Sequence, residues 1–176
     1  EEGERRRLAL VVALAVALVF LVTAALFESL RAPLVVLAAV PLALIGVFLL
    51  WWATGETFTR EAWIGVVMMA GIVVNNAILV VDRIGARARG DEAPPLPLRE
   101  AALEGTLDRV RPILMTTATT VLGLLPLVLF PGSVESNLWR SLALATIGGL
   151  LASTLFVLVT IPALAALLLP DRGDGS

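Results

Sequence analysis

Two neighbouring amides, Asn75 and Asn76, stand in the apolar run AGIVVNNAILVVDR and are the residues most suggestive of chemistry. An amide that lacks a hydrogen-bond partner in hydrocarbon is costly, so both side chains should face protein or water. Successive helical positions differ by about 100°, so the pair covers a wide polar face. Asp82 lies seven residues after Asn75 and points nearly the same way, about two turns further along. The spacing predicts a polar stripe in a membrane helix, which is typical of an ion or substrate path.

Helix packing is the alternative interpretation of the asparagines, and the residues alone leave both open. Asparagine side chains hydrogen-bond across helix interfaces without any transport role, at roughly 0.5–2 kcal/mol each. Asp82 has its own alternative, because a boundary carboxylate beside Arg83 can simply reach water.

A second group of polar residues lies in the stretch TTATT. Thr116, Thr119 and Thr120 are three and four residues apart and share one helix face, where hydroxyls could order the water of a relay. Threonines in membrane helices also bond back to their own backbone, which is the alternative. Arg109 and Arg111 precede this stretch and by themselves indicate only the cytoplasmic end of a membrane helix.

The elements that must position these residues are membrane helices. Hydrophobic residues make up 59% of the chain and charged residues 16%, unlike a soluble domain. About 20 consecutive apolar residues cross a bilayer as a helix, and the chain has five such runs. The predicted spans are residues 8–27, 34–52, 62–82, 112–130 and 142–169. The predicted fold class is all-α: a polytopic membrane helix bundle with five transmembrane helices.

Residues 98–110, LREAALEGTLDRV, carry apolar residues at roughly helical spacing. We predict an interfacial amphipathic helix here, on the cytoplasmic surface, before Pro112 starts the fourth span. A solvated linker helix is the alternative. We predict that residues 1–7 are the end of an extracytoplasmic region or linker and that residues 171–176 form a cytoplasmic tail.

The arginines predict the orientation, because loops on the cytoplasmic side carry the excess of basic residues. The predicted inner side holds Arg31, Arg83, Arg87, Arg89, Arg99, Arg109, Arg111 and Arg172, and the outer side Arg5, Arg6, Arg7, Arg60 and Arg140. The N-terminus is therefore expected outside the cytoplasm and the C-terminus inside. The three arginines before the first span oppose this, and a large translocated domain ahead of residue 1 would remove the conflict.

Several function classes find no support in the sequence. The chain has no Cys and no His, so a thiolate or imidazole metal site is excluded, and no metal or other cofactor is expected. We find no nucleotide-binding loop and no nucleophile–base pair, so an enzyme is not expected. Nucleic acid is not indicated as a partner, because the basic residues sit at helix ends.

Three stretches resemble helices of resistance–nodulation–division (RND) efflux permeases. GIVVNNAILVVDRI resembles the tenth transmembrane helix, FESLRAPLVVLAAVPLALIG the junction of the eighth and ninth, and RVRPILMTTATTVLGLLPLVL the eleventh. They occur in the family's order and spacing and cover nearly the whole chain. The resemblance implies the C-terminal membrane portion, helices eight to twelve, of a permease of the drug-efflux branch.

The resemblance also implies partners and a mechanism. Such pumps are homotrimers in the bacterial inner membrane that use proton influx to export hydrophobic and amphiphilic compounds. The implied partners are helices one to seven and the porter domains of the same permease, membrane lipid and, in two-membrane bacteria, a periplasmic adaptor and an outer-membrane channel. A related exporter of lipids, a secretion-assisting exporter and a truncated membrane protein without transport activity are the alternatives.

The family's relay combines paired aspartates of the fourth helix, a lysine of the tenth, and an arginine and a threonine around the eleventh. Arg109 and Thr116 match the last two positions, and Asn75 occupies the lysine position. A neutral amide cannot exchange charge with an aspartate as an ammonium can. We therefore expect Asn75, with Asn76 nearby, to hydrogen-bond the ionised carboxylates instead. The secondary candidates are Asp82, Thr119 and Thr120.

Overall fold

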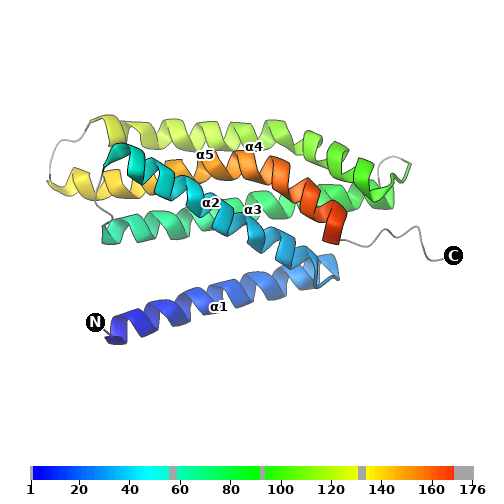
Figure 1. The fold of residues 1–176 in the computed structure, drawn as a ribbon, viewed down its shortest axis with the longest axis horizontal. Helices are drawn as coiled ribbons and strands as arrows, with labels where there is room; N and C mark the ends of the chain where they lie inside the picture. The colour runs from blue at the N-terminus through cyan, green and yellow to red at the C-terminus, as the bar shows by residue number, and fades with distance from the viewer. Residues whose placement is uncertain (1, 56–58, 92–93, 131–133, 169–176) are drawn as a thin grey trace.

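The computed structural model describes residues 2–55, 59–91, 94–130 and 134–168. The helices of these residues are, in order, α1 (Glu2–Phe27), α2 (Ala32–Thr54), α3 (Arg60–Arg89), α4 (Leu98–Leu129) and α5 (Val134–Leu168). Figure 1 shows α2 to α5 side by side in an elongated bundle, with successive helices running in opposite directions. The first residues of α1 and the last residues of α5 lie at opposite ends of the bundle. The predicted all-α membrane helix bundle is confirmed.

Glycine closes two of the helices, and proline precedes the start of a third. Gly55 and Gly90 adopt left-handed conformations, with φ of 65° and 78°, and close α2 and α3. A residue without a Cβ is favoured there, since the left-handed region is costly for other side chains. Pro97 immediately precedes the first residue of α4. Glu28 also has a positive φ, 48°, in the turn between α1 and α2.

The apolar lengths agree with most of the predicted spans. Four helical stretches of the described residues are long and apolar enough to cross a membrane: Ala32–Thr54, Glu61–Arg89, Leu98–Leu129 and Trp139–Ala165. In α1 the apolar stretch found among the described residues is shorter, Ala13–Phe27. The span at residues 8–27 therefore stays a prediction, although α1 itself is 26 residues long.

The structure corrects the boundary that we placed at Pro112. Residues 98–110 and the fourth span belong to one helix, α4, which is 32 residues long and contains Pro112 in its interior. Proline removes only one backbone N–H, and neighbouring helices support the segment on both sides of it, so the helix continues. Whether residues 98–110 also touch the membrane surface remains a prediction.

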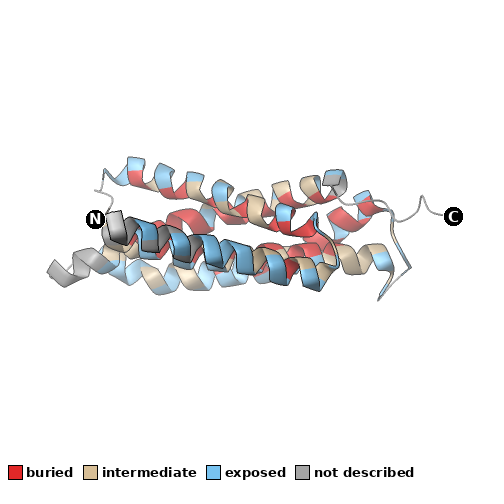
Figure 2. Cartoon of the chain, turned by 90° about the horizontal axis from the view of Figure 1, so that it is seen from below, coloured by how far each residue is buried: buried red, intermediate tan, exposed pale blue. Residues whose placement is uncertain are grey.

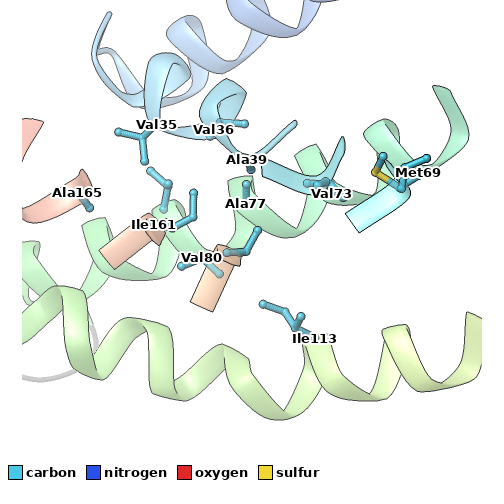
Figure 3. Close-up of a cluster of buried hydrophobic side chains, with 14 of the residues drawn as sticks. Val35, Val36, Ala39, Met69, Val73, Ala77, Val80, Ile113, Ile161 and Ala165 are labelled. Atoms are coloured by element: carbon cyan, nitrogen blue, oxygen red, sulfur yellow. The ribbon is translucent and has the colours of Figure 1, made fainter. Parts of the chain in front are cut away.

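The core of the bundle forms around α5, whose residues 143–150 are all buried. Figure 2 shows buried residues on the sides of the helices that face one another. Val35, Val73, Val80 and Ile161 contribute to this core from α2, α3 and α5 (Figure 3). Small residues let the backbones approach: a Cβ added at Gly148 would lie 2.9 Å from the Gly46 carbonyl oxygen. Lipid is as apolar as leucine, so burying leucine between helices gives no hydrophobic driving force in a membrane. Close packing of this kind holds the helices together instead.

The Gly46–Gly148 contact predicts a selective loss of stability. Gly46→Ala should lower the free energy of unfolding by about 1–3 kcal/mol, since its Cβ would collide with Ala152 Cβ and the Gly148 carbonyl oxygen. Gly123→Ala is the matched control, because a Cβ there meets nothing within 4 Å. Unfolding in detergent micelles measures both. Equal effects of the two substitutions would contradict the proposed tight contact of α2 with α5.

Candidate ion-coupling site

One face of α3 is not covered by the other helices. Its members recur every three or four residues, which is the spacing of a single helix face. They are Ile64, Met68, Gly71, Asn75, Leu79 and Asp82, and all are exposed. We call this set the free face of α3. Asn75 is the polar residue at its centre, fifteen residues after the first residue of α3 and fourteen before the last.

Asn76 points the other way. Its side chain is only 6% exposed, on the stripe of α3 that also carries the buried residues Val73 and Val80. The two amides therefore do not form the single wide polar face that the sequence suggested. Asn75 belongs to the free face together with Asp82, whereas Asn76 belongs to the bundle interior.

Asn75 has no hydrogen-bond partner among the described residues, and its amide lies midway along an apolar helix.

The positions of Asn75 and Thr116 along the bundle axis can be compared through the contact between α3 and α4. These helices run antiparallel (Figure 1), and a Cβ added at Gly105 would lie 2.9 Å from Ile84 Cα. Asn75 lies nine residues before Ile84, and Thr116 eleven after Gly105. At about 1.5 Å per residue, Asn75 and Thr116 differ in depth by only about 3 Å.

The hydroxyls of the predicted threonine face all bond to the backbone of α4. Thr116 donates to the Ile113 carbonyl at 3.0 Å, Thr120 to the Thr116 carbonyl at 2.8 Å, and Thr119 to the Met115 carbonyl. Thr116 and Thr119 are exposed and Thr120 is partly exposed. Each oxygen keeps acceptor capacity, since a hydroxyl has one hydrogen and two lone pairs. They could therefore accept a hydrogen bond from another group at the free side of α4.

Sequence reasoning did not single out Thr117, the residue of TTATT that faces inward. Its hydroxyl lies 2.8 Å from the Thr154 hydroxyl of α5, and both residues are buried. The signal was present in the spacing, because Thr117 continues the inward stripe of α4 that passes through Ile113. The partner on α5 could not be identified without the structure.

Arg109 lies on the same inward stripe, four residues before Ile113. The residue is partly buried, and its Nε is enclosed without a hydrogen-bond partner among the described residues. A buried guanidinium nitrogen without an acceptor is costly. Arg109 and Thr116, the two residues that match the family's relay, are seven residues apart and therefore point nearly the same way from α4. They differ in burial, since Arg109 is partly buried and Thr116 is exposed.

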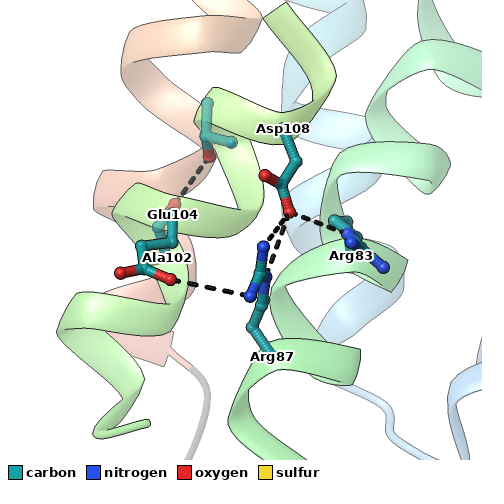
Figure 4. A network of polar contacts seen from close by, with 6 residues as sticks. Arg83, Arg87, Ala102, Glu104 and Asp108 are labelled. Atoms are coloured by element: carbon teal, nitrogen blue, oxygen red, sulfur yellow. Dashed lines mark hydrogen bonds and ion pairs between the residues drawn. The ribbon is translucent and has the colours of Figure 1, made fainter. Parts of the chain in front are cut away.

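A charged cluster that the sequence analysis missed joins the end of α3 to the beginning of α4 (Figure 4). Asp108 Oδ2 accepts from Arg83 Nε at 2.9 Å and from Arg87 Nε and Nη2 at 3.0 and 2.8 Å. Glu104 contributes more weakly, with 3.8 Å between its carboxylate and Arg87. We call these four residues the α3–α4 clamp. It lies before Pro112, outside the apolar part of α4.

The clamp shifts the acidity of its central carboxylate. The hydrogen bond from Arg87 is the main cause that lowers the pKa of Asp108 below its ordinary value. Partial burial opposes this, and the hydrogen bond from Arg83 adds to the lowering. Asp108 is therefore ionised at neutral pH and ties both arginines of α3 to α4.

The fold and the site define a class of protein: a multi-pass membrane helix bundle that presents a lone polar side chain at mid-depth on an uncovered helix face. The sequence profile of the AcrB/AcrD/AcrF family matches residues 1–168. The chain belongs to this family of RND permeases.

Relatives with known sequences and structures agree with this assignment. The chain is 39% identical over 156 residues to the swarming motility protein SwrC of Bacillus subtilis (strain 168), covering 89% of this chain and 14% of that protein. It is 38% identical over 162 residues to the multidrug resistance protein MdtC of Erwinia amylovora, covering 92% and 15%. A crystal structure of a heavy metal efflux pump superposes with a TM-score of 0.78 at 32% identity, covering 95% of this chain and 17% of the pump. The chain thus spans only about a sixth of the length of these proteins.

The geometry of the clamp predicts that Asp108 contributes more than Glu104 to the free energy of unfolding. Asp108→Asn should lower the free energy of unfolding by about 1 kcal/mol, and Glu104→Gln, at 53% exposure, by a few tenths at most. Because the folded-state pKa of Asp108 is depressed, its contribution is complete above the ordinary pKa of about 4 and is lost as pH falls through the lower folded value. Unfolding curves in detergent at pH 7 and pH 3 measure this. A difference between the parent chain and Asp108→Asn that is independent of pH would contradict it.

Proposed function

We propose that this chain forms helices eight to twelve of an RND secondary transporter that exports hydrophobic or amphiphilic compounds. Export is coupled to cation influx, with the proton as the coupling ion. The free face of α3 is the observation that carries this proposal: an amide without a described partner at mid-depth needs a polar neighbour from outside this bundle. A helix with ionisable carboxyls, contributed by the rest of the permease, meets that need.

Asn75 would sense the protonation of those carboxyls through a change in its hydrogen bonds. An ionised carboxylate only accepts, so the Asn75 amide NH₂ donates to it in a charge-assisted bond. A protonated carboxyl has an O–H of its own, and the charge-assisted bond is replaced by a weaker neutral one. The energy difference biases the packing of the carboxyl-bearing helix against α3, which is how a local protonation event shifts a helix arrangement.

The other candidates take graded roles in this proposal. Thr116 lies near the depth of Asn75 and offers its acceptor capacity to relay water, while Arg109 supplies a fixed positive charge on the same helix. Asn76 supports α3 from the interior. Asp82, Thr119 and Thr120 would line the exit of the ion path.

The cargo and the surroundings are part of the same proposal. The relative described as a multidrug resistance protein supports amphiphilic cargo. Heavy-metal ions are the second candidate cargo, because two solved crystal forms with this fold are described as a heavy metal efflux pump. We place the permease in the bacterial inner membrane as a trimer, with the N-terminus of this chain extracytoplasmic, the C-terminus cytoplasmic, and a periplasmic adaptor and outer-membrane channel as partners in two-membrane bacteria. It acts as a transporter and not as an enzyme.

Asn75→Ala is expected to reduce proton-coupled export by about tenfold or more, since a buried hydrogen bond to a charged group contributes roughly 1.5–3 kcal/mol. The assay is efflux of a fluorescent amphiphile from proteoliposomes that contain the whole permease under an imposed pH gradient. Leu79→Ala, one turn further on the same face, is the control and should keep most of the activity. Undiminished export by Asn75→Ala at normal protein levels would refute the coupling role.

Thr116→Val tests the relay hydroxyl separately. The substitution is nearly isosteric and removes a hydroxyl whose helix bond to the Ile113 carbonyl is not needed for helicity. We expect export to fall severalfold, with little change in the concentration of cargo that gives half-maximal rate. Thr119→Val should have a smaller effect. An export rate of Thr116→Val equal to that of the wild type would contradict the relay role and would indicate that the hydroxyl serves only its bond to the backbone.

A further inference from the structure

Few side chains of the membrane-spanning part of α4 are fully buried in the bundle. Between residues 112 and 129, only Ile113 and Thr117 are buried. The neighbours Thr116 and Ala118 are both exposed. Partly buried residues such as Val128 add apolar contacts with the core, but such contacts have no preferred direction and do not by themselves fix the rotation of the helix about its axis.

Thr117 supplies a directional contact at this place. Its hydroxyl lies 2.8 Å from that of Thr154, and the two residues are 5% and 6% exposed. Thr154 donates its own hydrogen to the Leu150 carbonyl at 2.8 Å. A hydroxyl has only one hydrogen, so Thr117 must be the donor and Thr154 the acceptor. This is a hydrogen bond between α4 and α5, buried in the apolar interior.

The bond sets the direction of Thr116. Adjacent residues of a helix point about 100° apart, so a Thr117 side chain fixed against α5 turns Thr116 to the free side of α4. Ile113 can accept a modest rotation, because dispersion contacts have no preferred direction. A hydrogen bond cannot, since it weakens steeply when the donor turns away from the acceptor.

The clamp at the other end of α4 does not make this contact redundant. Asp108 and Gly105 hold the first part of α4 against α3, but Pro112 follows. Pro112 has no N–H to offer the Asp108 carbonyl, so the helix lacks one of its own bonds at this point and can bend or twist there. The rotation of the part beyond Pro112 therefore needs its own constraint.

We propose that Thr117 is a positioning residue: its hydrogen bond to Thr154 locks the rotation of α4 and holds Thr116 at the face where the coupling ion passes. This inference rests on the proposed function of Thr116. The structural part, the rotational lock, can be tested without any transport measurement.

The lock is tested by spin labels attached one at a time to single cysteines at residues 118 to 125 in the whole, otherwise cysteine-free permease. Oxygen accessibility along a helix oscillates with its 3.6-residue period, and the phase of the oscillation reports the rotation of the helix. We expect Thr117→Val to shift or flatten the oscillation and Thr117→Ser, which keeps the hydroxyl, to restore it. Thr154→Val should act like Thr117→Val, and the double variant should be no worse than either. An unchanged phase in Thr117→Val overturns the proposal.

The consequence for coupling is measured with the same variants in proteoliposomes. Thr117→Val should lower pH-driven export about fivefold, the factor that corresponds to one net hydrogen bond of about 1 kcal/mol. It should also shift the pH profile of the rate, and Thr117→Ser should restore both. A shifted phase with normal export overturns the positioning role. If Thr116→Val is also fully active while the phase shifts, the failure lies in the proposed function of Thr116 and the rotational lock stands.

Discussion

A polar group inside a bilayer has no water to bond, and this constraint organises the whole bundle. Several polar side chains of the described spans meet it in one of two ways. Thr116, Thr120 and Ser153 bond to carbonyls of their own helices. Thr117 bonds to Thr154 of a neighbouring helix. Asn75 and Asn76 do neither among the described residues, although an amide is demanding because it has two donors and an acceptor oxygen. Asn76 is enclosed in the bundle, whereas Asn75 lies on an uncovered face, where a group from another part of the permease can reach it.

The packing of the other helices determines where Asn75 lies. Helix α5 forms the centre of the bundle, and small residues bring α2 and α3 close to it, so the backbone of α3 is held firmly behind Asn75. The α3–α4 clamp and the contact of Gly105 with Ile84 fix how far α4 slides along α3. As a result Thr116 is kept near the depth of Asn75. Asn75 and Thr116 are thus held at a similar depth by contacts between other residues of α3 and α4.

The parts of this arrangement that depend on local pattern could be predicted from the sequence. Apolar length predicted the helices, and the heptad spacing placed Asp82 on the same face as Asn75. What could not be predicted depends on which helix packs against which. The split of Asn75 and Asn76 follows from where α5 lies, and the pairs Asp108–Arg87 and Thr117–Thr154 join residues 21 and 37 positions apart. Proline misled the prediction at Pro112, because a proline inside a supported membrane helix removes a bond without ending the helix.

The central claim is that the amide at the centre of the free face is matched by an ionisable group from elsewhere in the permease. A structure of the whole permease in lipid, at a resolution that shows side chains, tests it most directly. The account predicts the Asn75 amide within about 3 Å of a carboxyl oxygen of another segment. A carboxamide of Asn75 surrounded by acyl chains, or bonded only to the backbone of α3, would contradict it.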